Sequence, residues 1–205
     1  MKLRDADRVG VLGVTGSGKS HFVKHRLVKR SRRCVVWDVH SEYAEPCDMD
    51  EVSLDELTRE PGLLQAGECK LAVVPEWDDP RELATAFTMF VSELKDSAQS
   101  ESLLVVVDEC GLLRPIADGS LVALAAQSRH WLMPLALVGQ RATMLPPGAR
   151  AQLSTIVSFR QTDPSDIDAL AERLGAVRAQ RITELKNHRF VTWSQNEKAK
   201  EEPEK

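Results

Sequence analysis

An uninterrupted glycine-rich motif near the start of the chain restricts the fold more than any other feature. Residues 13–20 read GVTGSGKS, which matches the phosphate-binding pattern G-x-x-x-x-G-K-S without a gap. Glycines let backbone N–H groups turn inward around an anion, and a helix that begins at the end of the loop adds the positive end of its dipole. An apolar run at Arg8–Gly13 precedes the loop, and a helix is expected from Lys19. This context favours a P-loop over a plain connecting turn.

Each residue type in the loop has an expected role in binding ATP and Mg²⁺. Lys19 supplies positive charge to the β- and γ-phosphates, and the Ser20 hydroxyl ligates Mg²⁺. Inward-pointing backbone N–H groups surround the remaining phosphate oxygens. The loop residues expected to bind the nucleotide are Gly13, Thr15, Gly16, Ser17, Gly18, Lys19 and Ser20.

Short apolar runs alternate with amphipathic stretches along the chain, a pattern typical of a mainly parallel sheet with helices on both faces. Leu103–Val107 has no polar member and predicts a central strand buried on both faces. A helix is expected over Asp79–Ser97, where Leu83, Phe87, Phe90, Val91 and Leu94 share one face. Further strands are expected at Cys34–Asp38, Lys70–Val74, Pro134–Gly139, Thr155–Arg160 and, at the sheet edge, His188–Ser194; further helices at Leu54–Arg59, Asp118–Arg129 and Asp163–Leu174; and a loop at Glu45–Asp50.

Length and composition indicate one α/β domain. The chain has 205 residues, of which 42% are hydrophobic and 28% charged, enough for a buried core. We expect the domain to span residues 1–194 and a charged, disordered tail to span 195–205. No segment reaches the roughly 20 apolar residues that cross a bilayer, and the start lacks a signal peptide, so we expect a soluble cytoplasmic protein. The four cysteines lack Cys-x-x-Cys spacing, which favours reduced thiols over a zinc site or disulfides.

Two acidic residues, Asp108 and Glu109, directly follow the apolar run Leu103–Val107. The carboxyl ends of parallel strands face the edge of the sheet where ligands bind. We therefore expect Asp108 to complete the nucleotide site and to hold Mg²⁺ together with Ser20, and Glu109 to polarise the attacking water. A single carboxylate in this position often only caps the next helix, but a tandem pair beside a P-loop favours the catalytic interpretation.

A polar residue, Gln140, follows the strand expected at Pro134–Gly139. There it either contacts the γ-phosphate and orients water, or merely opens the loop toward the proline pair at 146–147. Because hydrolysis builds negative charge on the transferred phosphoryl group, we also expect an arginine from a neighbouring subunit. The candidates that flank the Gln140 strand and loop are Arg129, Arg141 and Arg150.

Four blocks of sequence, taken in order, resemble the FtsK–HerA superfamily of P-loop ATPases, which pump DNA. They are GVTGSGKS at 13–20, WDVHSEY at 37–43, VVVDE at 105–109, and LVGQRAT at 137–143 with its continuation to residue 170. The resemblance implies a RecA/FtsK-like P-loop NTPase fold and Mg²⁺-dependent ATP hydrolysis coupled to DNA translocation. Relatives often carry a Gly-Arg pair where Ser128 and Arg129 stand here, which makes Arg129 the leading trans-acting catalytic arginine. Ala142 replaces the usual proline of the family.

A motor domain of this size is similar to the genome-packaging ATPases of membrane-containing icosahedral viruses. That resemblance implies a homo-oligomeric ring, a pentamer or hexamer, that drives double-stranded DNA into a preformed capsid. It also implies contact with a capsid-vertex or portal protein, in the host cytoplasm or at the virion vertex. The alternatives are a filamentous-phage-type extrusion ATPase, which normally carries a transmembrane segment, a small P-loop kinase, which needs a lid with arginines, and a nucleotide-dependent switch without turnover.

Overall fold

Strands and helices alternate along the protein in its computed structural model, which describes residues 3–65, 67–97 and 101–195. The strands are β1 Arg8–Leu12, β2 Arg33–Trp37, β3 Asp50–Ser53, β4 Cys69–Val74, β5 Leu104–Val107, β6 Leu135–Gly139, β7 Thr155–Ser158 and β8 Val191–Ser194. The α-helices are α1 Lys19–Phe22, α2 Ala44–Cys47, α3 Leu54–Arg59, α4 Pro80–Asp96, α5 Asp118–Gln127, α6 Pro147–Ala151, α7 Pro164–Leu174 and α8 Ala176–Arg181.

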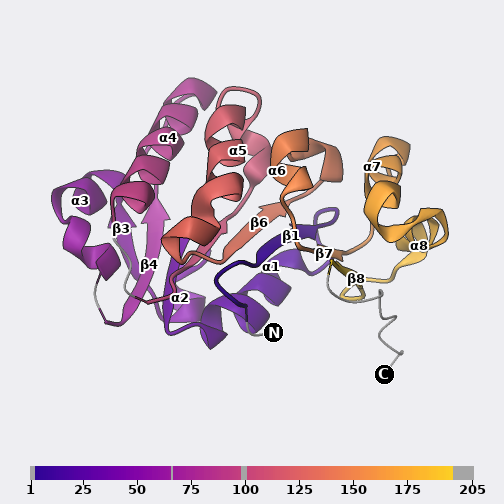
Figure 1. Ribbon diagram of the computed structural model, residues 1–205, viewed down its shortest axis with the longest axis horizontal. Helices are drawn as coiled ribbons and strands as arrows, with labels where there is room; N and C mark the ends of the chain where they lie inside the picture. Colours follow the sequence, from indigo (N-terminus) through magenta and orange to yellow (C-terminus); the bar gives the residue numbers. More distant parts are fainter. Residues whose placement is uncertain (1–2, 66, 98–100, 196–205) are drawn as a thin grey trace.

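The strands form one eight-stranded sheet in the order β3-β4-β2-β5-β6-β1-β7-β8 (Figure 1). Neighbouring strands are parallel, apart from the antiparallel pair β7 and β8. This arrangement confirms the predicted mainly parallel sheet and places the last strand at its edge. Since β1 lies between β6 and β7, the loop that follows β1 emerges between the carboxyl ends of those two strands.

Side chains on the strands alternate between two hydrophobic cores, one on each face of the sheet. On β5, Val105 and Val107 pack in one core, while Leu104 and Val106 pack in the other. Helices α3 to α7 cover the first face, and α1 and α2 cover the second (Figure 1). The prediction of helices on both faces is therefore confirmed.

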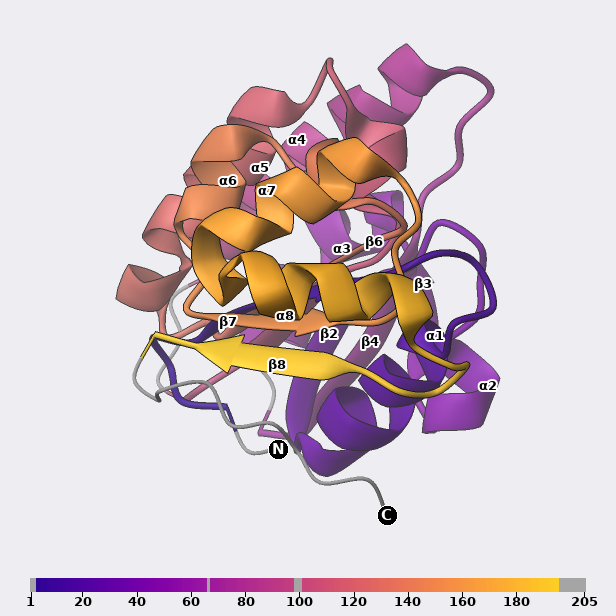
Figure 2. The ribbon, with the colours of Figure 1, turned by 90° about the vertical axis from the view of Figure 1, so that its right-hand side faces the viewer.

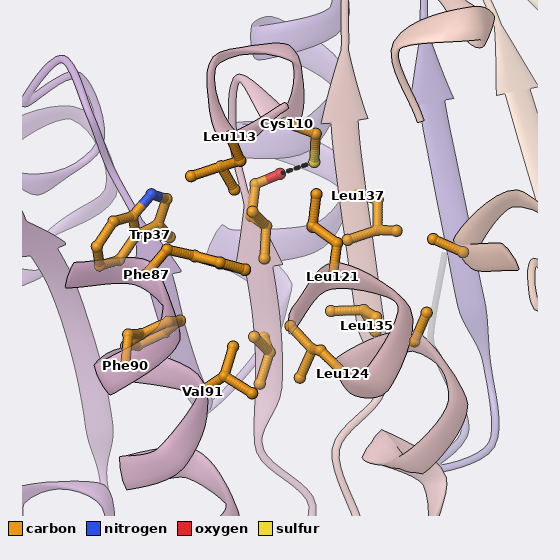
Figure 3. Close-up of a cluster of buried hydrophobic side chains, with 14 of the residues drawn as sticks. Trp37, Phe87, Phe90, Val91, Cys110, Leu113, Leu121, Leu124, Leu135 and Leu137 are labelled. Carbon is orange, nitrogen blue, oxygen red and sulfur yellow. Dashed lines mark hydrogen bonds between the residues drawn. The ribbon is translucent and has the colours of Figure 1, made fainter. Parts of the chain in front are cut away.

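The larger core holds the end of β2 against α4 (Figure 3). The ring of Trp37 lies 5.4 Å from that of Phe87 in an edge-on arrangement and 5.1 Å from that of Phe90. All five residues predicted to share one face of this helix are buried. Asp79 caps the helix by accepting hydrogen bonds from the backbone N–H groups of Arg81 and Glu82.

The predicted loop at Glu45–Asp50 is wrong, because α2 occupies part of it and β3 begins at Asp50. In β3 only Val52 is fully buried, so the strand shows no apolar run. Its place at the sheet edge depends on backbone hydrogen bonds to β4, which side-chain pattern does not reveal.

Two helical segments also differ from expectation. The helix after the glycine-rich loop is an α-helix only to Phe22 and continues as a π-helical turn over Val23–Leu27. Helix α8 was not predicted; it follows α7 directly after Gly175, and the two helices lie together at the β7–β8 end of the sheet (Figure 2).

Most of the expected tail, residues 196–205, lies outside the described residues. Within the described ranges, none of the helices has the length and hydropathy needed to cross a bilayer.

Candidate active site

The P-loop follows β1 and precedes α1, as the motif predicts, and it leaves the sheet between the ends of β6 and β7. The N–H of Gly13 donates a hydrogen bond to the carbonyl of Gly139 (3.3 Å), and the N–H of Val14 donates to the carbonyl of Arg160 (2.9 Å). Helix α1 begins immediately after Gly18, whose φ of 108° is rarely adopted by residues with a side chain. The loop is thus anchored on both sides and opens onto a helix N-terminus.

The loop has the form of a cradle for an anion. A Cβ atom added to Gly13 would lie 2.5 Å from the Cβ of Phe159 and 2.8 Å from the Oγ of Ser17. Ser17 is buried, and its Oγ has no hydrogen-bond partner in the described part of the chain. A buried hydroxyl without a partner is costly, so this atom fits a ligand that supplies one. These features fit the phosphates of a nucleotide.

Lys19 lies in the cradle, 7% exposed, with its Nζ donating to the carbonyl of Val14 at 3.2 Å. Burial lowers the pKa of this amine, and the nearby carboxylates of Glu109 and Asp108 partly offset that effect. The structure therefore brings the predicted phosphate-binding cation close to the predicted acidic pair.

Asp108 stands at the end of β5 with both carboxylate oxygens held in place. Its Oδ2 accepts a hydrogen bond from the Tyr43 hydroxyl (2.8 Å), and its Oδ1 accepts one from the N–H of Glu109 (2.9 Å). Burial raises the pKa of Asp108, and the hydrogen bond from Tyr43 acts in the opposite direction. An oriented carboxylate together with the Ser20 hydroxyl suits the hard oxygen ligation that Mg²⁺ prefers.

Glu109 and Gln140 meet although they come from different strands. The Nε2 of Gln140 donates to both carboxylate oxygens of Glu109, at 3.3 and 3.4 Å. Glu109 has a φ of 48°, which is uncommon outside glycine and is often found at functional sites. The side chain after β6 therefore points toward the acidic pair, as its expected role in orienting water requires.

Tyr43 is a site residue for which sequence reasoning proposed no role. The Asp38 carboxylate accepts hydrogen bonds from the N–H groups of Glu42 (3.0 Å) and Tyr43 (2.8 Å), and this turn directs the fully buried Tyr43 toward Asp108. Burial and the Asp108 carboxylate raise the pKa of the Tyr43 hydroxyl, which therefore stays protonated and donates. The only signal in the sequence was the block WDVHSEY.

The three candidate arginines have different surroundings. Arg141 forms ion pairs with Asp163 (2.7 Å) and with the buried Asp166 (2.9 Å), and Arg150 donates to the carbonyl of Ala142 (3.1 Å). Arg129 is exposed in the turn after α5. It lies near Arg8, whose pKa is lowered first by burial and second by the positive charge of Arg129. Because Arg8 begins β1 and the P-loop follows its end, the structure does not bring Arg129 to the site of its own chain.

A hollow of about 460 Å³ lies beside the tip of the P-loop. The hollow is lined by residues of the P-loop and by residues that follow β6 and β7, and the sequence patterns assigned no role to three of them, Val14, Arg160 and Thr162. The lining residues are Val14, Thr15, Gln140, Arg141, Arg160 and Thr162.

The sequence profile of the central domain of helicase HerA matches residues 6–109, from β1 through the acidic pair. The chain belongs to this family. It is a HerA-like P-loop ATPase in family and fold, which confirms the resemblance drawn from the four sequence blocks. No curated protein sequence matches the chain.

Solved structures share the fold of this HerA-like chain over nearly its whole length. The genome packaging NTPase B204 from Sulfolobus turreted icosahedral virus 2, in complex with ATP-gammaS, is 20% identical with a TM-score of 0.67, over 95% of this chain and 94% of that chain. B204, the DNA-packaging ATPase from Sulfolobus turreted icosahedral virus, is 19% identical with a TM-score of 0.65, over 95% of each chain. VirB4 of Thermoanaerobacter pseudethanolicus is 11% identical with a TM-score of 0.68, over 99% of this chain and 92% of that chain. At these identities the comparison shows a common fold.

Proposed function

We propose that this HerA-like protein is an ATP-driven translocase of double-stranded DNA that packages a viral genome into a preformed capsid. The proposed ATPase activity rests on one observation: at the carboxyl ends of the central strands, the structure brings together Lys19, Asp108, Glu109 and Gln140. The DNA part is supported by the family match and by the fold shared with B204 over 95% of both chains.

Each residue of the site has a separate role in the proposed hydrolysis of ATP. Ser20 and Asp108 would hold Mg²⁺, which neutralises charge on the β- and γ-phosphates when bound. Lys19 binds the same phosphates from the floor of the loop, while Glu109 orients the attacking water and accepts its proton. Gln140 holds the Glu109 carboxylate through its amide and contacts the γ-phosphate.

Translocation requires subunits that act in turn along the DNA. We propose a homo-oligomeric ring, a pentamer or hexamer, in which Arg129 of one subunit serves the P-loop of the next. Its exposure, and its position at the edge of the sheet opposite its own P-loop, support such a role. The ring would work in the host cytoplasm and at a virion vertex, against a capsid-vertex or portal protein.

The deciding experiment measures ATP hydrolysis by the purified protein with and without double-stranded DNA, together with its mass in solution. We expect DNA to stimulate turnover and the mass to be that of a ring. A monomer that consumes ATP only when a small phosphate acceptor is added would contradict the proposal and identify a kinase. Nucleotide binding without turnover in either condition would identify a switch.

The Tyr43–Asp108 hydrogen bond predicts a specific Mg²⁺ phenotype. Tyr43→Phe removes the hydroxyl and keeps the buried ring, so Asp108 loses one of its two fixed contacts. We expect the Mg²⁺ concentration that half-saturates nucleotide binding to rise by about 10–100-fold, the range seen when residues that support metal ligands are changed. Calorimetric titration of Mg²⁺ with a non-hydrolysable ATP analogue measures it directly.

Thr88→Val is the matched control, because it also deletes a hydroxyl, but one whose contacts among the described residues are Ser120 and the Ala84 carbonyl, on the α4–α5 side of the sheet. It should leave the Mg²⁺ dependence unchanged. An unchanged dependence in Tyr43→Phe as well would show that Asp108 needs no support from Tyr43.

A further inference from the structure

The hollow beside the P-loop contains two arginines that differ in how their charge is balanced. Arg141 is neutralised by the carboxylates of Asp163 and Asp166. Arg160 forms neither an ion pair nor a side-chain hydrogen bond with any described residue, and its Nε is buried without a partner. One wall of the hollow therefore carries an uncompensated positive charge.

The backbone of Arg160 is fixed against the P-loop itself. The N–H of Phe159 donates to the carbonyl of Leu12 (2.7 Å), and the carbonyl of Arg160 accepts from the N–H of Val14 (2.9 Å). Phe159 is buried and packs against the rings of Phe22 and Phe190, at centroid distances of 6.0 and 5.3 Å. The backbone of Arg160 is therefore held in a fixed position directly beside the P-loop.

The chemistry of the hollow suits an oxyanion. Thr15, Thr162 and Gln140 contribute hydroxyl and amide groups, and none of the lining residues is acidic. A partly buried guanidinium without a counter-charge is unfavourable until an anion arrives. Arginine also matches the geometry of a phosphate group better than lysine does, because its planar N–H groups form paired hydrogen bonds.

Gln140 lines the hollow and also bonds Glu109, so the hollow lies on the side of the loop where the proposed site would hold the γ-phosphate. We propose that Arg160 binds the terminal phosphate of ATP from within the same chain, so that the site distinguishes ATP from ADP. This inference rests on the proposed binding of ATP at the P-loop. It assigns to Arg160 a role separate from that of Arg129, which would act on a neighbouring subunit.

The test compares two nucleotides in the Arg160→Gln variant of the full chain. Binding of ATPγS and of ADP, both with Mg²⁺, is measured by displacement of a fluorescent ADP analogue. We expect ATPγS to bind about 10–100-fold more weakly than to the unmodified protein, the effect of losing a charge-assisted hydrogen bond, and ADP affinity to stay the same. Arg160→Lys should recover part of the ATPγS affinity.

Arg59→Gln is the matched control, since it removes one positive charge from an exposed pair with Asp55 on α3, at the other end of the sheet. It should change neither affinity. Equal losses for ATPγS and ADP in Arg160→Gln, or no loss for either, would overturn the inference. Weaker inhibition of turnover by inorganic phosphate, with ATPγS affinity unchanged, would overturn it too and assign Arg160 to released phosphate.

The same binding experiment distinguishes a failure of the proposed function from a failure of this inference. An unmodified protein that binds neither nucleotide would refute ATP binding itself, whereas nucleotide binding that is indifferent to Arg160 would refute this inference alone. Thermal unfolding of each variant, with a midpoint equal to that of the unmodified protein, shows that a loss of affinity is not a loss of fold.

Discussion

Replacing Glu109 by glutamine is expected to lower ATP turnover by about 10²- to 10⁴-fold while ATP binding persists. The substitution removes the group that accepts the proton of the attacking water but keeps the size of the side chain. Glutamine can still meet the amide of Gln140, which lies 3.3 Å from Glu109 Oε1. Single-turnover hydrolysis and equilibrium binding of ATPγS, measured side by side, separate the two effects.

Glu172→Gln provides the control for this experiment, because it neutralises an exposed carboxylate on α7. Its turnover should equal that of the unmodified protein. Full activity in Glu109→Gln would remove Glu109 as the catalytic base and would leave Asp108 as the remaining acid of the pair.

Lys19→Ala is expected to weaken ATPγS binding by about 100-fold, equivalent to the upper end of 1.5–3 kcal/mol for a charge-assisted hydrogen bond. Turnover should fall below detection, since the same ammonium group contacts the phosphates that react. The variant should remain folded. Burial already lowers the pKa of Lys19, so its charge is held at a free-energy cost before nucleotide arrives.

Lys95→Ala, an exposed position near the end of α4, controls for the loss of one positive charge. Nucleotide affinity should not change in it. Wild-type affinity in Lys19→Ala, measured by calorimetry, would contradict the P-loop interpretation of residues 13–20.

Local patterns accounted for much of the fold. Helix α4 was predicted because its apolar residues recur at helical spacing and share one face, and all five of them are buried in the structure. The central strand β5 was predicted because the run Leu103–Val107 has no polar member, and all four residues of the observed strand are buried. Strand β3 was missed because an edge strand with a single fully buried side chain has no such pattern.

The candidate site was predicted only in part for a related reason. The P-loop is an uninterrupted run of residues, and so is the acidic pair after its apolar strand. Each could therefore be recognised from its own local sequence. Tyr43 lies in the block WDVHSEY, but that block did not indicate a role for it, and Arg160 was assigned no role from the sequence. Their roles depend on contacts with Asp108 and Val14, which come from other strands.

The sequence by itself determined the chemistry available at this site: a phosphate cradle, a lysine, a tandem pair of acids and a glutamine after an apolar strand. Tertiary structure alone decided which of these groups meet. The order β2-β5-β6-β1-β7 brings Tyr43, Asp108, Gln140, the P-loop and Arg160 to neighbouring positions along one edge of the sheet. That order depends on burying both faces of the sheet under helices, and the free energy of this packing is shared by the whole core. The spacing of residues within one motif therefore does not reveal it.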